Sequence, residues 1–181
     1  MQVTINRNNL LDWLSVVGKA IPSKAPFPAI DGVYMRIKGD GLVLCANNLE
    51  MAIRLFARGL ESSGEGAVVL PRQFVQVIKQ VPGNKVDITV KDNKAVVISG
   101  KSRFKLNCVS ADEFPVVDNT YLDKPSFKIE GRLLKEMIAK TTFCVANSTA
   151  NHIFQGVFIS NDGGKLICLA SDTHRLAWYE K

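Results

Sequence analysis

Histidine and cysteine are scarce in this chain of 181 residues, which has two of the first and four of the second. Cys45, Cys108, Cys144 and Cys168 lie far apart and form no CxxC pair. The sequence therefore lacks the spacing of a zinc knuckle or a disulfide framework and predicts buried, free thiols. The HxH, HExxH, GxSxG and Walker-type patterns are absent as well, which removes the commonest signatures of metallohydrolases, serine hydrolases and nucleotide-binding enzymes.

The sequence also lacks a long hydrophobic run. No apolar stretch approaches the roughly 18 residues of a membrane-spanning helix, and the N-terminal MQVTINRNN has neither the basic nor the apolar segment of a secretory signal. We therefore expect a soluble, cytoplasmic protein with no membrane partner. Lysine and arginine outnumber aspartate and glutamate by 23 to 17, a net charge of +6 that permits a polyanionic partner without requiring one.

One segment of the chain occurs twice. GVYMRIKGDGLVLCA at residues 32–46 returns as GVFISNDGGKLICLA at residues 156–170, an ungapped offset of 124 residues that also places Leu10 on Leu134. Any two hairpins can share glycines, but helix-face leucines in the same register indicate a duplicated domain. The sequence predicts a complete copy over residues 1–123 and the first half of another over residues 124–181, with apolar faces left uncovered in the second.

Apolar periodicity shows that each copy is itself built from two similar halves. Two sets of four residues follow helical spacing at an offset of 64 residues: Leu10, Leu11, Leu14 and Val17, then Phe74, Val75, Ile78 and Val81. One short strand precedes each predicted helix and three follow it, with KGDG as a hairpin turn. We expect an α+β fold of repeated βαβββ units, with the helices on one face of antiparallel sheets.

Capping and breaking residues predict where these elements begin and end. Asn8 or Asn9 is expected to cap the first helix, and Pro71 is expected to open the second. Residues 127–129 should form the first strand of the second copy. The segment 112–124 breaks the periodicity and is the best candidate for a linker.

The polar faces of the predicted helices carry more basic than acidic residues. The bases are Lys19, Arg72, Lys79, Arg132, Lys135 and Lys140, with Glu136 as one opposing acid on the third helix. Such faces suit a surface near phosphates. An ordinary solvated helix face has the same composition, and charge by itself favours that simpler explanation.

Three further segments carry a resemblance to a known family. NLEMAIRL after the first hairpin, SGKSRF near the end of the first copy and SDTHRLA after the second hairpin resemble the β subunit of bacterial DNA polymerase III, the sliding clamps. The similarity runs in order from VTINRNNLL to HRLAWYEK. It implies the DNA-clamp fold with three domains per subunit, of which this chain supplies the first and part of the second and lacks the third.

The resemblance also implies a function. Clamps of this family close head to tail as a homodimer around duplex DNA, so that a polymerase stays on its template by topology. The resemblance implies a non-enzymatic processivity factor without cofactor or metal. Its implied partners are duplex DNA, the DNA polymerase III core, the clamp loader and repair proteins, and its DNA binding carries no sequence specificity.

Three sets of site residues follow from the resemblance and the basic faces. The DNA-binding set is Lys24, Arg72, Lys79, Arg132, Lys135, Ser148 and His152. Of these, Lys24, Ser148 and His152 match DNA-approaching loops; an ordinary solvent loop is the alternative for all three and the favoured explanation for Ser148. The partner-peptide cleft corresponds to Phe154, Ser171, Thr173, His174, Arg175 and Leu176, with Thr173 where a glycine is expected. The subunit interface corresponds to Lys101, Arg103, Phe104, Lys105 and Leu106.

Two other functions remain open on the sequence. Asp172 and His174, with Asp31 or Glu50, supply residue types of a hydrolytic or metal site. Against this, the first copy has Asn48 and Glu50 at the matching positions, which a symmetric active site would not allow. An adaptor that binds proteins without encircling DNA fits the same features, and retention on circular DNA separates it from a clamp.

Overall fold

The computed structural model describes residues 1–115, 127–148 and 151–181. The chain divides into two compact units, Met1–Asn119 and Thr120–Lys181, which are described one at a time. The boundary expected between residues 123 and 124, and most of the expected linker, lie outside the described residues. Within the described parts, no helix is long and apolar enough to cross a membrane.

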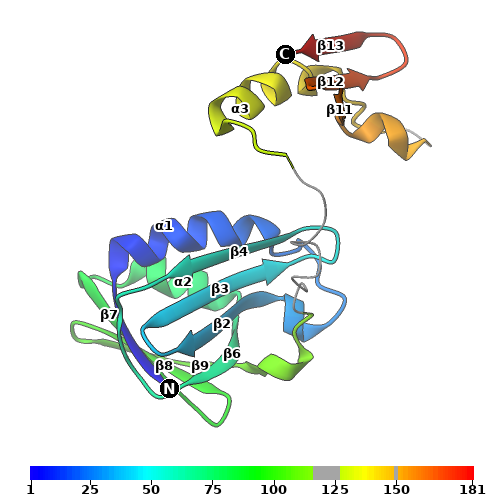
Figure 1. Cartoon of the computed structure of the whole chain (residues 1–181). Coiled ribbons are helices and arrows are strands. Elements are labelled where there is room, and N and C mark those ends of the chain that lie inside the picture. The colour runs from blue at the N-terminus through cyan, green and yellow to red at the C-terminus, as the bar shows by residue number, and fades with distance from the viewer. Residues whose placement is uncertain (116–126, 149–150) are drawn as a thin grey trace. The chain divides into compact units, whose positions relative to one another are not determined.

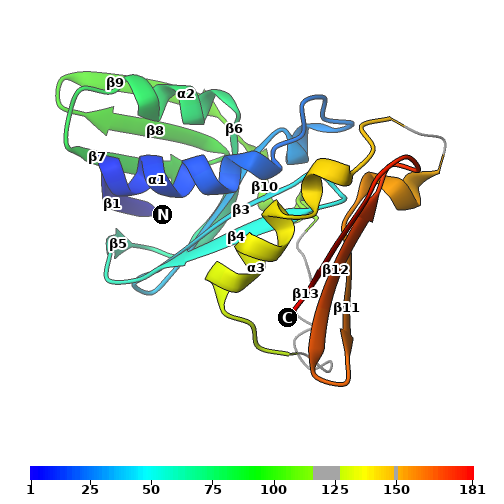
Figure 2. The ribbon, with the colours of Figure 1, turned by 90° about the horizontal axis from the view of Figure 1, so that it is seen from above.

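The first unit consists of two antiparallel sheets and two neighbouring helices (Figures 1 and 2). One sheet has the order β5 (Glu61–Ser63), β1 (Gln2–Asn6), β7 (Lys85–Lys91), β8 (Lys94–Ser99) and β9 (Ser102–Asn107). The other has the order β10 (Val109–Ser110), β6 (Gly66–Pro71), β2 (Gly32–Lys38), β3 (Gly41–Asn47) and β4 (Ala52–Ala57). The α+β class and the βαβββ order are confirmed, while the short strands β5 and β10 were not predicted.

The two βαβββ halves exchange their first strands. β1 leaves its own half and pairs with β7, where Val3 lies opposite Ile88. β6 in turn pairs with β2, where Leu70 lies opposite Val33. Each sheet is therefore completed by a strand from the other half, so neither half can form its sheet alone.

The helices α1 (Arg7–Val17) and α2 (Gln73–Gln80) lie side by side and share one core with the inward faces of both sheets (Figure 2). Their buried residues are Leu10, Leu14 and Val17 of α1 and Phe74 and Ile78 of α2. Short 3-10 helices, Gly18–Ala20 and Pro28–Ile30, flank the Pro-rich loop between α1 and β2. The polar faces of α1 and α2 stay in solvent, as the apolar spacing predicts.

Two helix boundaries differ from the expected ones. The side chain of Asn6, and not of Asn8 or Asn9, caps α1 by accepting the backbone N–H groups of those two residues at 2.9 and 3.4 Å. Pro71 ends β6 opposite Gly32, so α2 begins at Gln73. The strands approach so closely there that a Cβ on Gly32 would lie 2.1 Å from the Leu70 carbonyl oxygen, which only glycine permits.

The second unit packs one helix on a three-stranded antiparallel sheet. Its elements are α3 (Gly131–Ala139), the 3-10 helices η5 (Thr142–Cys144) and η6 (His152–Gln155), and β11 (Phe158–Asp162), β12 (Lys165–Ser171) and β13 (Leu176–Glu180). Residues 127–129 form no strand, contrary to the prediction. Their counterpart in the first unit, β1, pairs with β5 and β7. Among the described residues of the second unit, no strand corresponds to β5 or β7.

The loop after the repeated hairpin has the same structure in both units, at residues 47–51 and 171–175. In each, the side-chain oxygen of the second residue accepts the backbone N–H groups of the fourth and fifth residues at 3.0 and 2.7 Å. The third residue is left-handed in each, with φ of 75° at Leu49 and 77° at Thr173. The duplication read from the sequence therefore extends to individual hydrogen bonds.

The left-handed backbone of Thr173 predicts a stabilising substitution. A β-branched side chain is strained at positive φ and Thr173 is exposed, so Thr173→Gly removes strain and loses little packing. After allowing for the extra freedom of glycine in the unfolded chain, we expect a net gain of about 1 kcal/mol in the second unit. Urea unfolding followed by Trp178 fluorescence measures it. Thr173→Ala keeps the positive φ and should gain less; equal gains would contradict the explanation.

Candidate nucleic-acid interface

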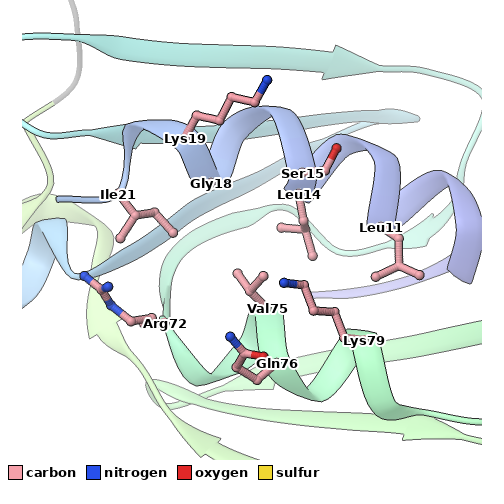
Figure 3. Close-up of a pocket in the computed structure, with 10 residues that line it drawn as sticks. All are labelled: Leu11, Leu14, Ser15, Gly18, Lys19, Ile21, Arg72, Val75, Gln76 and Lys79. Carbon is pink, nitrogen blue, oxygen red and sulfur yellow. The ribbon is translucent and has the colours of Figure 1, made fainter. Parts of the chain in front are cut away.

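A groove of about 440 Å³ runs between α1 and α2 (Figure 3). Its residues are Leu11, Leu14, Ser15, Gly18, Lys19 and Ile21 on one side and Arg72, Val75, Gln76 and Lys79 on the other. Apolar side chains form its floor, and three cations stand along it. None of the described residues that line it is acidic, and Arg72 pairs with Asp31 next to it, so Lys19 and Lys79 supply the positive charge that can attract phosphates.

The basic residues expected to bind DNA in the first unit differ in exposure and in ion pairing. Lys79 and Lys19 are exposed and form no ion pair within the described residues. Lys24 is exposed on the Pro-rich loop before β2. Arg72 is half-buried instead, and its Nε and Nη2 atoms lie 2.8 and 2.7 Å from Asp31 Oδ1. The structure thus leaves three lysines available to an anion and commits the arginine to a carboxylate.

The second unit carries the other residues of the expected DNA-binding set. Arg132 and Lys135 are exposed on α3, and Ser148 is exposed in the segment before η6. His152 Nδ1 lies 3.1 Å from Gln155 Oε1.

A three-residue network fixes the end of α3 to the sheet. Glu136 Oε1 lies 3.0 Å from Lys140 Nζ and accepts the Tyr179 hydroxyl at 3.0 Å, while the Lys140 ammonium lies 5.0 Å from the Tyr179 ring centre. Donation by Lys140 and then by Tyr179 lowers the pKa of Glu136 below its usual value. Lys140, counted among the basic helix residues, is therefore engaged with its own unit.

The residues expected in the peptide cleft lie on two neighbouring features of the second unit. Phe154 is half-buried in η6, and Ser171, Thr173, His174, Arg175 and Leu176 form the turn from β12 to β13. The Arg175 guanidinium donates to Asp172 Oδ2 at 2.8 and 3.0 Å and to the Phe143 carbonyl at 3.4 Å. Leu176 is 64% exposed and presents an apolar side chain at the start of β13.

The same ion pair predicts a pH dependence of the turn. Side-chain and backbone donation by Arg175 lowers the pKa of Asp172 from 3.8 to about 2. A carboxylate with a lowered pKa stabilises the folded turn above pH 3.8 and loses this contribution as the pH falls through about 2. We expect the Arg175 amide proton shift in NMR spectra to titrate near pH 2. Asp172→Asn removes the titration; a midpoint near 4 in the unaltered chain would contradict the pairing.

The residues expected at the subunit interface lie on β9, an edge strand, and on the turn before it. Lys101, Arg103 and Lys105 are exposed, whereas Phe104 and Leu106 pack against the core of their own unit. The basic side chains thus alternate with partly buried apolar ones, as on a strand with one face against the core. The strand edge itself is free to pair within the described residues.

Two of the acids considered for a hydrolytic site are bound to arginines. Asp172 is bound by Arg175, and Asp31 by Arg72. In the described parts of the chain, no three histidine, cysteine or acidic side chains are placed to hold a metal ion. Burial raises the pKa of Cys45, Cys108 and Cys168, which disfavours the thiolate that a nucleophile or a metal ligand requires.

Comparison with known proteins gives consistent matches. The family model described as the N-terminal domain of the DNA polymerase III beta subunit matches residues 1–118, and the model of its central domain matches residues 128–181. The chain is 31% identical to a beta sliding clamp of Bacillus subtilis and 30% identical to one of Staphylococcus epidermidis, with 98% of this chain aligned in each case. It spans about half the length of these relatives, 49% of each.

Solved structures agree with the sequence relatives. The DNA polymerase III subunit beta of Pseudomonas aeruginosa superposes with a TM-score of 0.93 at 28% identity, covering all of this chain and 50% of that one. The sliding clamp of Bacillus subtilis gives a TM-score of 0.92, again at 28% identity and half coverage. The chain belongs to the family of the DNA polymerase III beta subunit.

Proposed function

We propose that the protein serves as a sliding clamp for the bacterial replicative DNA polymerase, encircling duplex DNA as a ring. The observation that supports this proposal is the groove between α1 and α2. Basic side chains line it, and none of the described residues that line it is acidic. Lysines contact phosphates as mobile point charges and read no base, which suits a ring that must slide. Processivity then arises from topology and requires no catalytic residue and no cofactor.

The assembly proposed for this function is a head-to-tail homodimer in the cytoplasm. Residues 1–123 form its first clamp domain, and residues 124–181 carry the opening elements of the second. The edge strand β9 is the proposed seam, with Arg103 and Lys105 facing acids of the partner subunit. An exposed basic edge resists unspecific strand pairing, so an acidic partner edge also supplies specificity.

The peptide cleft is the proposed site for the polymerase core, the clamp loader and repair proteins. The exposed Leu176 and the half-buried Phe154 supply apolar contacts, and the backbone of the turn at Thr173 can pair with an extended peptide. Arg175 keeps the turn in shape through Asp172 and can share its remaining donors with peptide oxygens. In this proposal, Asp172 and Arg175 fix the shape of the turn at the edge of the cleft, and the apolar residues contact the peptide.

Salt-dependent DNA binding tests the proposal on this chain. We expect weak binding to a fluorescent 30-base-pair duplex. The affinity should not depend on the DNA sequence and should fall steeply as the salt concentration rises. Each of Lys19→Ala, Lys24→Ala and Lys79→Ala should lower the slope of log affinity against log salt by about 0.9, the value for one neutralised phosphate. Fluorescence anisotropy at several salt concentrations gives the slopes.

A lysine on the outward side of a sheet is the matched control. Lys38 is exposed at the end of β2, where the outward residues face away from the core shared with the helices. Lys38→Ala changes the net charge by the same amount and should leave the slope unchanged. Equal slopes for Lys38→Ala and for the variants at Lys19, Lys24 and Lys79 would show that binding follows net charge alone. That result would refute the groove and the neighbouring Pro-rich loop as the DNA surface.

A further inference from the structure

We infer that Arg72 is a positioning residue that closes the base of the Pro-rich loop and holds Lys24 at the DNA surface, an inference that rests on the proposed function. One Arg72 side chain reaches both ends of the loop. Its Nη2 donates to the Pro22 carbonyl, and its Nε donates to Asp31 Oδ1 at 2.8 Å. Its backbone N–H also donates to the Asp31 carbonyl at 3.1 Å.

The loop needs such a clasp because it has few bonds of its own. Its prolines at positions 22, 26 and 28 have no backbone N–H to donate. In the described part of the chain, residues 23–26 form no hydrogen bond. The far end is anchored by Ala29 and Ile30, both fully buried. The near end is held by Ala20, which is fully buried, and by Ile21, which packs against the core. For the tip, which carries Lys24, the contact between Arg72 and Pro22 is the nearest hydrogen bond on that side.

The chemistry of this clasp is specific to arginine. A guanidinium presents several N–H groups in one rigid plane and can bind a carboxylate and a carbonyl at once, whereas a lysine ammonium is a single point on a flexible stem. Arg72→Lys therefore keeps the charge and loses the clasp. This variant separates a positioning role from direct attraction to phosphate, which a lysine would largely preserve.

Asp31 provides the sharper distinction. Removing an acid from a surface near DNA ordinarily strengthens binding, because it removes repulsion of the phosphates. If Asp31 instead holds Arg72 and the loop, Asp31→Ala weakens binding by releasing Lys24. The two explanations therefore predict opposite changes in DNA affinity for Asp31→Ala.

The first experiment needs no DNA. Trypsin cuts the Lys24–Ala25 bond only when the loop opens to fit the protease, so the cutting rate reports the fixation of the loop. With the full chain and mass spectrometry, we expect Arg72→Lys, Arg72→Gln and Asp31→Ala to speed this cut several-fold. Lys79→Gln, a change on the same groove away from the loop, should not. An unchanged melting temperature of the first unit excludes general unfolding.

The second experiment measures duplex binding by the same variants. Asp31→Ala and Arg72→Lys should each lower the salt slope by about 0.9, as Lys24→Ala does. Asp31→Ala added to Lys24→Ala should cause no further loss, since the clasp acts through Lys24. Tighter binding by Asp31→Ala, or an Arg72→Lys variant equal to the unaltered chain in both experiments, overturns the inference. Faster cutting without any duplex binding by the unaltered chain keeps the clasp and rejects the proposed function.

Discussion

Leu10→Ala is expected to destabilise the first unit by about 2–5 kcal/mol, the usual range for emptying a buried leucine site. Leu10 is 1% exposed in the core shared by both helices and both sheets. Leu134, its equivalent 124 positions later, is half-buried beside an apolar hollow on α3. Leu134→Ala should therefore cost less than about 1 kcal/mol in the second unit. Urea unfolding measures both costs.

The comparison between Leu10 and Leu134 tests whether equivalent positions of the repeat differ in stability because they differ in burial. In the first unit, Leu10 shares one core with residues of α2 and of both sheets. Within the described residues, the second unit has no element that matches α2. Equal costs for the two substitutions would mean that Leu134 is covered in solution, by another copy of the chain or by the first unit.

The two units should unfold in separate steps, the second well before the first. Phe158 and Ile159 of β11 are 62% and 44% exposed, whereas their equivalents Tyr34 and Met35 in β2 are 8% and 1% exposed. Less buried apolar surface means less stability. The two tryptophans, Trp13 and Trp178, lie one in each unit and report each step by fluorescence.

We expect the midpoint reported by Trp178 in a Trp13→Phe chain to lie at least about 1 M urea below that reported by Trp13 in a Trp178→Phe chain. This gap corresponds to about 1–3 kcal/mol at ordinary urea dependences. Coincident midpoints would contradict the independence of the units. A Trp178 midpoint that rises with protein concentration would show that the exposed faces associate.

The sequence predicted most of the fold because its patterns are local. The apolar spacing of Leu10 and Phe74 and the glycine turn at Gly39 are set within a few residues, so the helices and hairpins were located correctly. The exchange of β1 and β6 between halves depends on contacts far apart in the chain, and no local pattern encodes it. The short strands β5 and β10 escaped prediction because three and two residues give no alternation to read.

The candidate site was predictable in its residue types and less so in their partners. Lys24 and Lys79 lie exposed as expected. Arg72 is predicted to be among the DNA-binding residues, and the structure adds an unpredicted partner, Asp31, because the partner that an arginine finds depends on which loop packs beside it. Nothing in the sequence joins two residues that far apart. The glycine expected at position 173 does have a physical basis, since Thr173 occupies the left-handed conformation that glycine prefers.

Retention on circular DNA distinguishes a ring that encircles the duplex from a protein that only binds its surface. The natural gene product that contains this sequence is loaded onto nicked circular duplex and separated from free protein, and the DNA is then cut once by a restriction enzyme. A ring that encircles DNA stays on the closed circle at high salt and slides off the linear molecule. Equal retention on both forms would contradict the clamp and favour an adaptor that binds without encircling.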